Sequence, residues 1–248
     1  MSADTPVALI TGAARRLGAA TARALHERGY RVLLHCRQHP AEAAALAHAL
    51  NRVRAQSAQV VQADLANRDE VRALAHTATH HWGRLDVLVN NASAFRPTPI
   101  DSSTDQDWDE LLHTNLRAPY LLIQGCLPAL RAQRGSIVNL IDVYAQRPLP
   151  NHPLYCASKA GLAMLTQALA RDLAPEIRVN GVSPGAILWP EGDTPIDPVY
   201  QQSILAKTPL ARTGTPDDIA RAVCWLACDA PFVTGQILAI DGGRSLNI

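Results

Sequence analysis

Three residues in the second half of the chain, Asp142, Tyr155 and Lys159, have the types and spacing needed to deliver protons. Tyr155 and Lys159 begin an apolar stretch and lie four residues apart, so they share one face of the expected helix. A phenol with an ordinary pKa of about 10 needs help to act as an acid or base near neutrality, and a nearby ammonium supplies it by stabilising the phenolate. Asp142, at the end of an expected strand, can add a carboxylic acid to the pair. The three residues are therefore a candidate catalytic group.

The composition indicates a globular protein that acts on a small molecule. The 248 residues are 48% hydrophobic, which suits one domain with a substantial core. The 23 basic and 22 acidic side chains nearly cancel, so no overall field favours nucleic acid or an anionic membrane as a partner. Apolar runs stop short of membrane-spanning length and the N-terminus lacks a signal-peptide pattern, so we expect a cytoplasmic location.

The cysteines and histidines do not predict a metal site. Five cysteines are scattered along the chain without the close pairs that zinc and redox sites use, and we expect them to be reduced. Cys224 and Cys228 could share a helical face, but no His or acidic ligand joins them at a suitable spacing.

Short apolar strands alternate with helical segments along the whole chain. The expected strands comprise residues 7–10, 31–36, 58–62, 85–89, 136–141, 178–182 and 236–240. The expected helices comprise residues 19–28, 41–50, 68–81, 107–130, 155–173, 199–206 and 216–227. This alternation predicts an α/β fold, a Rossmann-type doubly wound parallel sheet in a single domain over residues 1–248. Residues 186–196 are irregular and rich in Pro, Gly and acids, and with the helix that ends at 206 they form the expected substrate loop.

A glycine turn joins the first strand to the first helix. Gly12 allows a tight turn, Gly18 allows the helix to approach the sheet, and the helix N-terminus offers N–H groups to a pyrophosphate. The second strand ends without the acidic residue that binds the ribose of NAD, and it carries His35 and Arg37 instead. With Arg16 in the turn, two guanidinium groups are available for a 2′-phosphate, which favours NADP(H). Arg37 could also be a solvated loop cation.

Several further motifs, in the same order along the chain, make the sequence resemble the short-chain dehydrogenase/reductase family over nearly its full length. They are Thr11-Gly12 to Gly18, Asp64-Leu65, Asn90-Asn91-Ala92, Asn115, Tyr155-x-x-x-Lys159, Arg178-Val-Asn180, Pro184-Gly185 and Asp241-Gly242-Gly243. The resemblance implies that Asn115 orders a water for catalysis and that the protein is a homotetramer. The residues that it implies for cofactor binding are Gly12, Arg16, Leu17, Gly18, His35, Arg37, Asp64, Leu65, Asn91, Ala92, Ser93, Tyr155, Lys159, Pro184 and Gly185.

Four departures from the general family pattern resemble the pteridine reductase branch. Arg16 replaces the middle glycine of the turn, Asp142 replaces the usual Ser, and Ala92 is followed by Ser93-Ala94-Phe95. The fourth departure is the loop sequence Ile187-Leu188-Trp189-Pro190-Glu191. The substrate-binding residues that this likeness implies are Arg16, Ser93, Phe95, Asp142, Tyr155, Leu188 and Trp189.

A pterin suits these residues chemically. Phe95 can stack on a flat heterocycle opposite the nicotinamide, while Ser93 and Arg16 can bind its polar edge. Reduction of a C=N bond requires a hydride at carbon and a proton at nitrogen. In an apolar pocket the pKa of Asp142 would rise, so that this acid can support Tyr155 in supplying the proton. The expected activity is that of an NADPH-dependent pteridine reductase.

The same residues could also have simpler structural roles. Phe95 could pack in the core, Ser93 could be a turn residue, Asp142 could be a cap or an ion-pair partner, and Arg16 could serve the cofactor phosphate. The rival activity is reduction of a ketone such as a 3-oxoacyl thioester, although an ionised Asp142 would repel the developing alkoxide. A non-catalytic NADP-binding sensor or scaffold is disfavoured because the motif residues Asn115, Tyr155 and Lys159 are all present.

Overall fold

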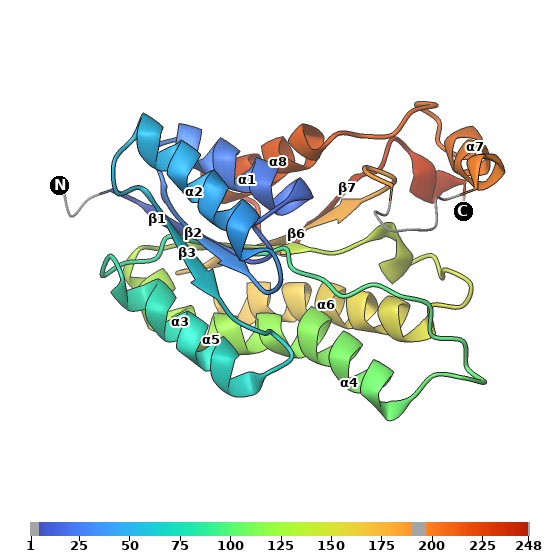
Figure 1. Ribbon diagram of the computed structural model, residues 1–248, viewed down its shortest axis with the longest axis horizontal. Coiled ribbons are helices and arrows are strands. Elements are labelled where there is room, and N and C mark those ends of the chain that lie inside the picture. The colour runs from blue at the N-terminus through green and yellow to red at the C-terminus, as the bar shows by residue number, and fades with distance from the viewer. Residues whose placement is uncertain (1–4, 190–196, 248) are drawn as a thin grey trace.

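The computed structural model describes residues 5–189 and 197–247. Within these residues seven parallel strands form one sheet in the order β3-β2-β1-β4-β5-β6-β7 (Figure 1). The strands are β1 (Val7–Ile10), β2 (Arg31–Cys36), β3 (Ala58–Gln62), β4 (Val87–Asn90), β5 (Ser136–Leu140), β6 (Arg178–Pro184) and β7 (Ile237–Ile240). The strand order reverses between β1 and β4, which opens a ligand crevice at the carboxyl ends of the strands. The predicted Rossmann-type doubly wound sheet is confirmed.

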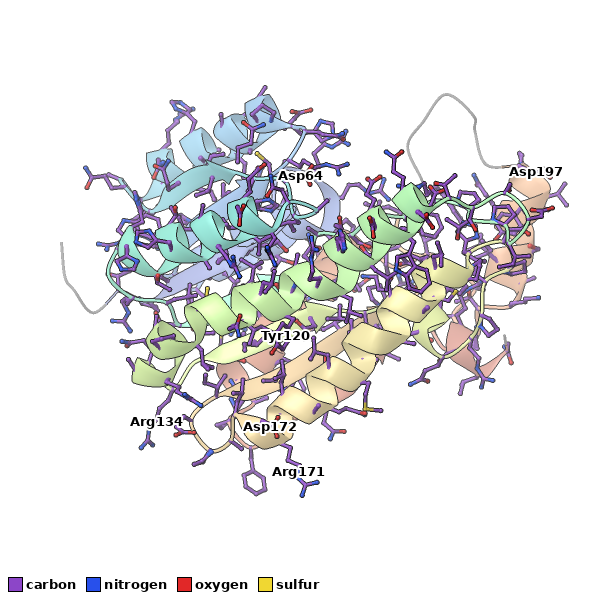
Figure 2. The ribbon with its side chains drawn as sticks, turned by 90° about the horizontal axis from the view of Figure 1, so that it is seen from below. Asp64, Tyr120, Arg134, Arg171, Asp172 and Asp197 are labelled. Carbon is purple, nitrogen blue, oxygen red and sulfur yellow. The ribbon has the colours of Figure 1, made fainter. Side chains whose placement is uncertain are left out.

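Helices cover both faces of the sheet (Figure 1). One face carries α1 (Arg16–Glu27), α2 (Pro40–Val53) and α8 (Pro216–Cys224). The other face carries α3 (Arg68–His80), α4 (Asp105–Leu112), α5 (Ala118–Ala132) and α6 (Pro153–Asp172), of which α4 and α6 lie side by side (Figure 2). The short helix α7 (Pro198–Ala206) lies apart from both layers, near the C-terminal end of the chain (Figure 1).

The strands are apolar on both sides because each face packs against helices. In β1, Leu9 belongs to the core under α3 and α5, whereas Ile10 belongs to the core under α1 and α8. Leu33 and Leu34 divide between the two cores in the same way in β2. This two-sided burial explains why the strands are continuous hydrophobic runs rather than alternating patterns.

The helix predicted over residues 107–130 is interrupted. Between α4 and α5 the chain forms a π-helical turn, His113–Arg117, and Asn115 lies buried within it. A π turn inserts one residue and rotates the following helix relative to the preceding one, which the sequence periodicity did not reveal. Other element boundaries differ from prediction by a few residues, as is usual for helix and strand ends.

Part of the expected substrate loop, from Pro190 and Glu191 to Ile196, lies outside the described residues. The described part of the loop ends at Trp189, and the chain is described again from Asp197 at the start of α7. No helix in the described ranges has the length and apolar character needed to cross a membrane. The same ranges contain no cluster of three or more His, Cys, Asp or Glu side chains that could hold a metal ion.

Candidate active site

Asp142 and Tyr155 meet at the carboxyl end of β5. The Tyr155 hydroxyl donates a hydrogen bond of 2.7 Å to Oδ2 of Asp142. The other carboxyl oxygen, Oδ1, accepts the Tyr144 backbone N–H at 2.9 Å and so caps the short 3-10 turn Val143–Ala145. Asp142 is therefore both a cap and the partner of the phenol, because each role uses a different oxygen. The cap fixes the carboxyl group in the position where it contacts Tyr155.

Lys159 lies one helical turn beyond Tyr155 on α6 and is buried, with 2% of its surface exposed. Its ammonium donates to the backbone carbonyl of Leu140 at 2.8 Å and lies 5.9 Å from the centre of the Tyr155 ring. Burial lowers the pKa of Lys159 to about 8, against the opposing attraction of Asp142. A buried cation is costly, so its place beside the phenol marks a functional site rather than a stabilising core contact.

The proton-bearing groups have shifted pKa values. Burial raises the pKa of Asp142, although hydrogen bonds from Tyr144 and Tyr155 and the cations of Lys159 and Arg244 oppose this. Burial, followed by the charge of Asp142, raises the pKa of Tyr155 well above its ordinary value. The net pKa of Tyr155 is thus raised rather than lowered as expected, because burial and Asp142 dominate. The phenol stays protonated across neutral pH and is ready to donate.

Asn115 uses its whole side-chain amide to hold the segment before Phe95. Its Oδ1 accepts the Ala94 backbone N–H at 2.8 Å and the Ser93 hydroxyl at 3.2 Å. Its Nδ2 donates to the Ala94 carbonyl at 2.9 Å and to the Ser158 hydroxyl oxygen at 3.0 Å. Both donors and both acceptor positions are occupied. Asn115 therefore ties the Ser93 segment to α6, and its predicted role in ordering a water stays a prediction.

Phe95 faces a cavity rather than the core, with 49% of its surface exposed. The rings of Phe95 and Tyr155 pack edge to face, with their centroids 4.8 Å apart and their planes at 88°. His152 stacks on Phe95 at 4.8 Å and 18°. Core packing is thus excluded as the role of Phe95. His152 was not predicted as a site residue, although its position three residues before Tyr155 could have indicated it.

The catalytic group opens into a cavity of about 770 Å³. The wall combines aromatic and aliphatic side chains with a small number of polar groups, as is typical of sites for small molecules. The predicted site residues that line it are Phe95, Asp142, Gly185, Leu188 and Trp189, and those that prediction missed include Tyr144, His152, Lys207 and Arg244. Gly185 is required here because a Cβ atom on it would lie 2.7 Å from the Cα of Asp241. Pro184 ends β6 just before this glycine.

A second cavity, of about 350 Å³, lies over the glycine turn. The predicted cofactor residues that line it are Gly12, Arg16, Leu17, Gly18, His35, Arg37, Asp64, Leu65, Asn91, Ala92 and Ser93. Gly12 adopts a φ of +64°, and a Cβ atom on Gly18 would lie 2.1 Å from the Gly12 carbonyl oxygen. The turn therefore requires glycine at both positions, and this close backbone cradle at the start of α1 fits the pyrophosphate of a dinucleotide.

His35 holds the glycine turn in place through hydrogen bonds. The Gly12 backbone N–H donates to Nδ1 of His35 at 3.1 Å, so Nε2 carries the proton that is shared with the Ala63 carbonyl at 3.0 Å. The ring is 1% exposed, and burial lowers its pKa. A neutral imidazole with both nitrogens occupied positions the turn and does not supply charge for a phosphate.

The two arginines predicted for the 2′-phosphate line the cofactor cavity, but both also make contacts within the protein. Arg16 has a φ of +53°, and its guanidinium donates to the Trp189 carbonyl at 3.0 Å and the Leu188 carbonyl at 3.1 Å. It thereby joins the glycine turn to the substrate loop. Arg37 lines the cofactor cavity, but it also pairs with Glu110, 3.3 Å away.

A further pair of basic side chains lies at the rim of the same cavity. Arg15 Nη2 lies 2.7 Å from Nε2 of His39, and both residues line the cavity beside Gln38. Neither residue was predicted to bind the cofactor. Their position directly after the first and second strands could have indicated them, because these two strand ends are adjacent in a doubly wound sheet.

A glycine turn at the end of β1, with a Tyr–Lys–Asp group at the end of β5, defines an NAD(P)-dependent oxidoreductase with a Rossmann-type sheet. The chain belongs to the short-chain dehydrogenase/reductase family. Residues 12–245 match a family model described as enoyl-(acyl carrier protein) reductase.

Curated relatives include enzymes with two different substrates. The chain is 38% identical to pteridine reductase 1 of Leishmania tarentolae, over 99% of this chain and 98% of that protein. It is 37% identical to the 3-oxoacyl-[acyl-carrier-protein] reductase FabG of Staphylococcus aureus strain Mu50, over 96% and 98% of the two chains. A ketoacyl reductase of the granaticin polyketide synthase from Streptomyces violaceoruber is 35% identical, over 98% and 97%. These identities establish a reductase of this family and do not decide between a pterin and a ketoacyl substrate.

Proposed function

We propose that the protein is an NADPH-dependent pteridine reductase that converts a dihydropterin or an oxidised pterin into a tetrahydropterin. The observation that carries the proposal is the 2.7 Å hydrogen bond between Tyr155 and Asp142 in a cavity walled by the exposed ring of Phe95. An acid paired with the phenol suits protonation of a ring nitrogen. An exposed aromatic ring suits stacking on a flat heterocycle.

The cofactor supplies the hydride when it is bound. Gly12, Gly18 and the N-terminus of α1 are placed to hold its pyrophosphate, and Arg15 and Arg37 give the adenosine end a basic rim. This basic rim, together with the lack of an acid at the end of β2, supports NADPH over NADH.

The chain's own residues then move the proton. Tyr155, held protonated by its raised pKa, donates to the ring nitrogen next to the carbon that receives the hydride. Asp142 accepts the phenol's hydrogen bond and can return a proton to the phenolate, because its raised pKa keeps part of it protonated. Lys159 stabilises the transient phenolate from beneath the ring. One hydride and one proton add across each C=N bond.

Reduction of a 3-oxoacyl thioester is the second candidate, and the likeness to the ketoacyl reductases favours it. Hydride transfer to the ketone carbon would develop negative charge on the ketone oxygen beside Tyr155 and Asp142. A carboxylate there would oppose that charge unless it were protonated. The exposed ring of Phe95 also suits a flat pterin better than an acyl chain.

The test compares substrates with the purified protein by following nicotinamide absorbance. Dihydrobiopterin, dihydromonapterin, dihydrofolate and acetoacetyl-CoA are assayed with NADPH and with NADH, and Tyr155→Phe is the control for specific catalysis. We expect turnover of a pterin with NADPH and loss of turnover in the variant. Turnover of acetoacetyl-CoA alone would replace the proposal with a ketoacyl reductase. The proposal also includes a homotetramer in the cytoplasm, and light scattering tests the assembly.

A further inference from the structure

The substrate cavity contains a buried guanidinium that the mechanism above does not use. Arg244 lies in the short turn after β7, lines the cavity and is 5% exposed. Its Nη1 donates to the Ile204 carbonyl at 3.1 Å, and its Nη2 reaches the Tyr144 hydroxyl at 3.4 Å. It forms no ion pair with any carboxylate in residues 5–189 or 197–247. A guanidinium has five N–H donors, so this pairing leaves most of its capacity for a ligand.

The surroundings of Arg244 stabilise its buried charge only in part. Ile204 belongs to the last turn of α7, whose carbonyls carry partial negative charge, so this helix end stabilises a cation in part. A buried charge is nevertheless unfavourable unless an opposite charge pairs with it. Asp142 attracts Arg244 without an ion-pair contact, so the guanidinium keeps donors for an anion that enters the cavity.

Other charges around the cavity have the same sign. Lys207 and Arg147 line it, and both are exposed. Lys207 is one of two lysines in the whole chain, and the other is Lys159. Among the described lining residues, Asp142 is the one acid, and the Tyr155 hydroxyl already occupies one of its oxygens. Away from Asp142 the cavity is therefore basic.

The geometry also fixes where the anion would lie relative to the chemistry. Tyr144 donates its backbone N–H to Asp142 and its hydroxyl contacts Arg244, so one residue links the proton donor to the guanidinium. The substituent of a pterin whose ring reaches Tyr155 can extend within this one cavity to Arg244 and to Lys207, which follows the last turn of α7.

We propose that Arg244, with Lys207, binds an anionic group on the substrate's side chain, a carboxylate or a phosphate ester. The inference rests on the proposed function and names the substrate class, which is a pterin with a negatively charged tail rather than a neutral hydroxylated one. The planar guanidinium can bind two oxygens of such a group at once.

The experiment compares kcat/KM for three reduced pterins that differ in the tail. Dihydrobiopterin has a neutral tail, dihydrofolate carries carboxylates, and dihydroneopterin monophosphate carries a phosphate. We expect at least one anionic substrate to exceed dihydrobiopterin by about tenfold or more at low salt, the effect of one charge-assisted pair. The preference should shrink as salt is added, because exposed Lys207 is screened. The two anionic substrates together show whether the subsite takes carboxylate or phosphate.

Variants assign the preference to residues. Arg244→Gln should reduce the ratio of anionic to neutral kcat/KM by about tenfold, and Arg244→Lys should restore part of it. Lys207→Gln gives a smaller reduction of the same ratio, and its exposed position avoids a folding defect. Arg171→Gln is the matched control, because it removes an exposed positive charge at the far end of α6 (Figure 2) and should leave the ratio unchanged.

The outcomes separate this inference from the proposed function. Equal kcat/KM for neutral and anionic pterins, or an unchanged ratio in both Arg244→Gln and Lys207→Gln, would overturn the anion subsite while pterin reduction stands. Turnover of acetoacetyl-CoA without any pterin would overturn the proposed function, and the subsite with it.

Discussion

Replacement of Lys159 by Met should change how stability depends on pH, and the size of the change follows from burial. Burial lowers the pKa of Lys159 from 10.5 to about 8. Well below pH 8, Lys159 is protonated in both the folded and the unfolded states, so the full cost of burying the ammonium is present. Between the two pKa values the unfolded state binds more protons, and the free energy of unfolding therefore rises with pH. Integrated from pH 7 to pH 10, this rise is about 2–3 kcal/mol.

The assay measures urea unfolding of the wild type and of Lys159→Met at pH 7, 8, 9 and 10. We expect the wild type to gain about 2–3 kcal/mol relative to the variant across this range. Lys159 can donate to the Leu140 carbonyl both as an ammonium and as an amine, so loss of this hydrogen bond lowers the stability of the variant at every pH. Lys207→Met is the matched control, since this exposed lysine is the other one in the chain.

A direct measurement of the pKa completes the test. With lysine labelled by carbon-13, the chain gives two side-chain resonances, and the one that Lys159→Met removes should titrate near pH 8. Parallel stability curves for wild type and variant, together with a titration near pH 10.5, would refute the argument that burial destabilises the ammonium. The role of Lys159 as a cation held beneath the phenol at an energetic cost would then be lost.

Three further predictions concern activity. Asp142→Asn should lower kcat for a dihydropterin by about 10²–10⁴-fold and leave the NADPH dissociation constant within about twofold. In the wild type, kcat/KM should fall as pH rises through the raised pKa of Asp142. The pH profile of the variant should lack this decrease. An equal loss of turnover and NADPH binding would contradict the proton-donor role. Phe95→Leu should raise the pterin KM by about 2–10-fold, the worth of one aromatic stack, and unchanged KM would mean that the ring does not touch substrate. Arg16→Ala removes the bonds to the Leu188 and Trp189 carbonyls, so steady-state kinetics should show a larger rise in the pterin KM than in the NADPH KM; the reverse order would assign Arg16 to the cofactor phosphate.

Local spacing was sufficient to predict the framework of this protein. The continuous apolar runs of β1 and β2 arise because both faces of the sheet are covered. Glycine is required at position 12 by its positive φ and at position 18 by the close approach of the Gly12 carbonyl oxygen. Tyr155 and Lys159 share a helical face because their separation matches one turn. Asp142 falls next to them because the ends of neighbouring elements meet at one edge of a parallel sheet.

Contacts between distant segments decided the rest. The π turn at Asn115 adds one residue without a periodic signal, and it is the packing against α6 that makes its amide hold the Ser93 segment. Arg16 lies in the glycine turn, yet its guanidinium reaches the Leu188 carbonyl, which is 172 positions away in sequence.

The electrostatics of the site also required the tertiary structure. Sequence alone identified a phenol beside an ammonium and predicted a lowered phenol pKa, whereas burial together with Asp142 raises it. Arg244 likewise belongs to no local sequence motif that predicts a role. Only the structure shows that it is enclosed beside Tyr144 and the end of α7. Sequence spacing thus determined which groups are neighbours along one element. Desolvation and long-range pairing, which depend on how the elements pack, determined the charge each group carries and the ligand it faces.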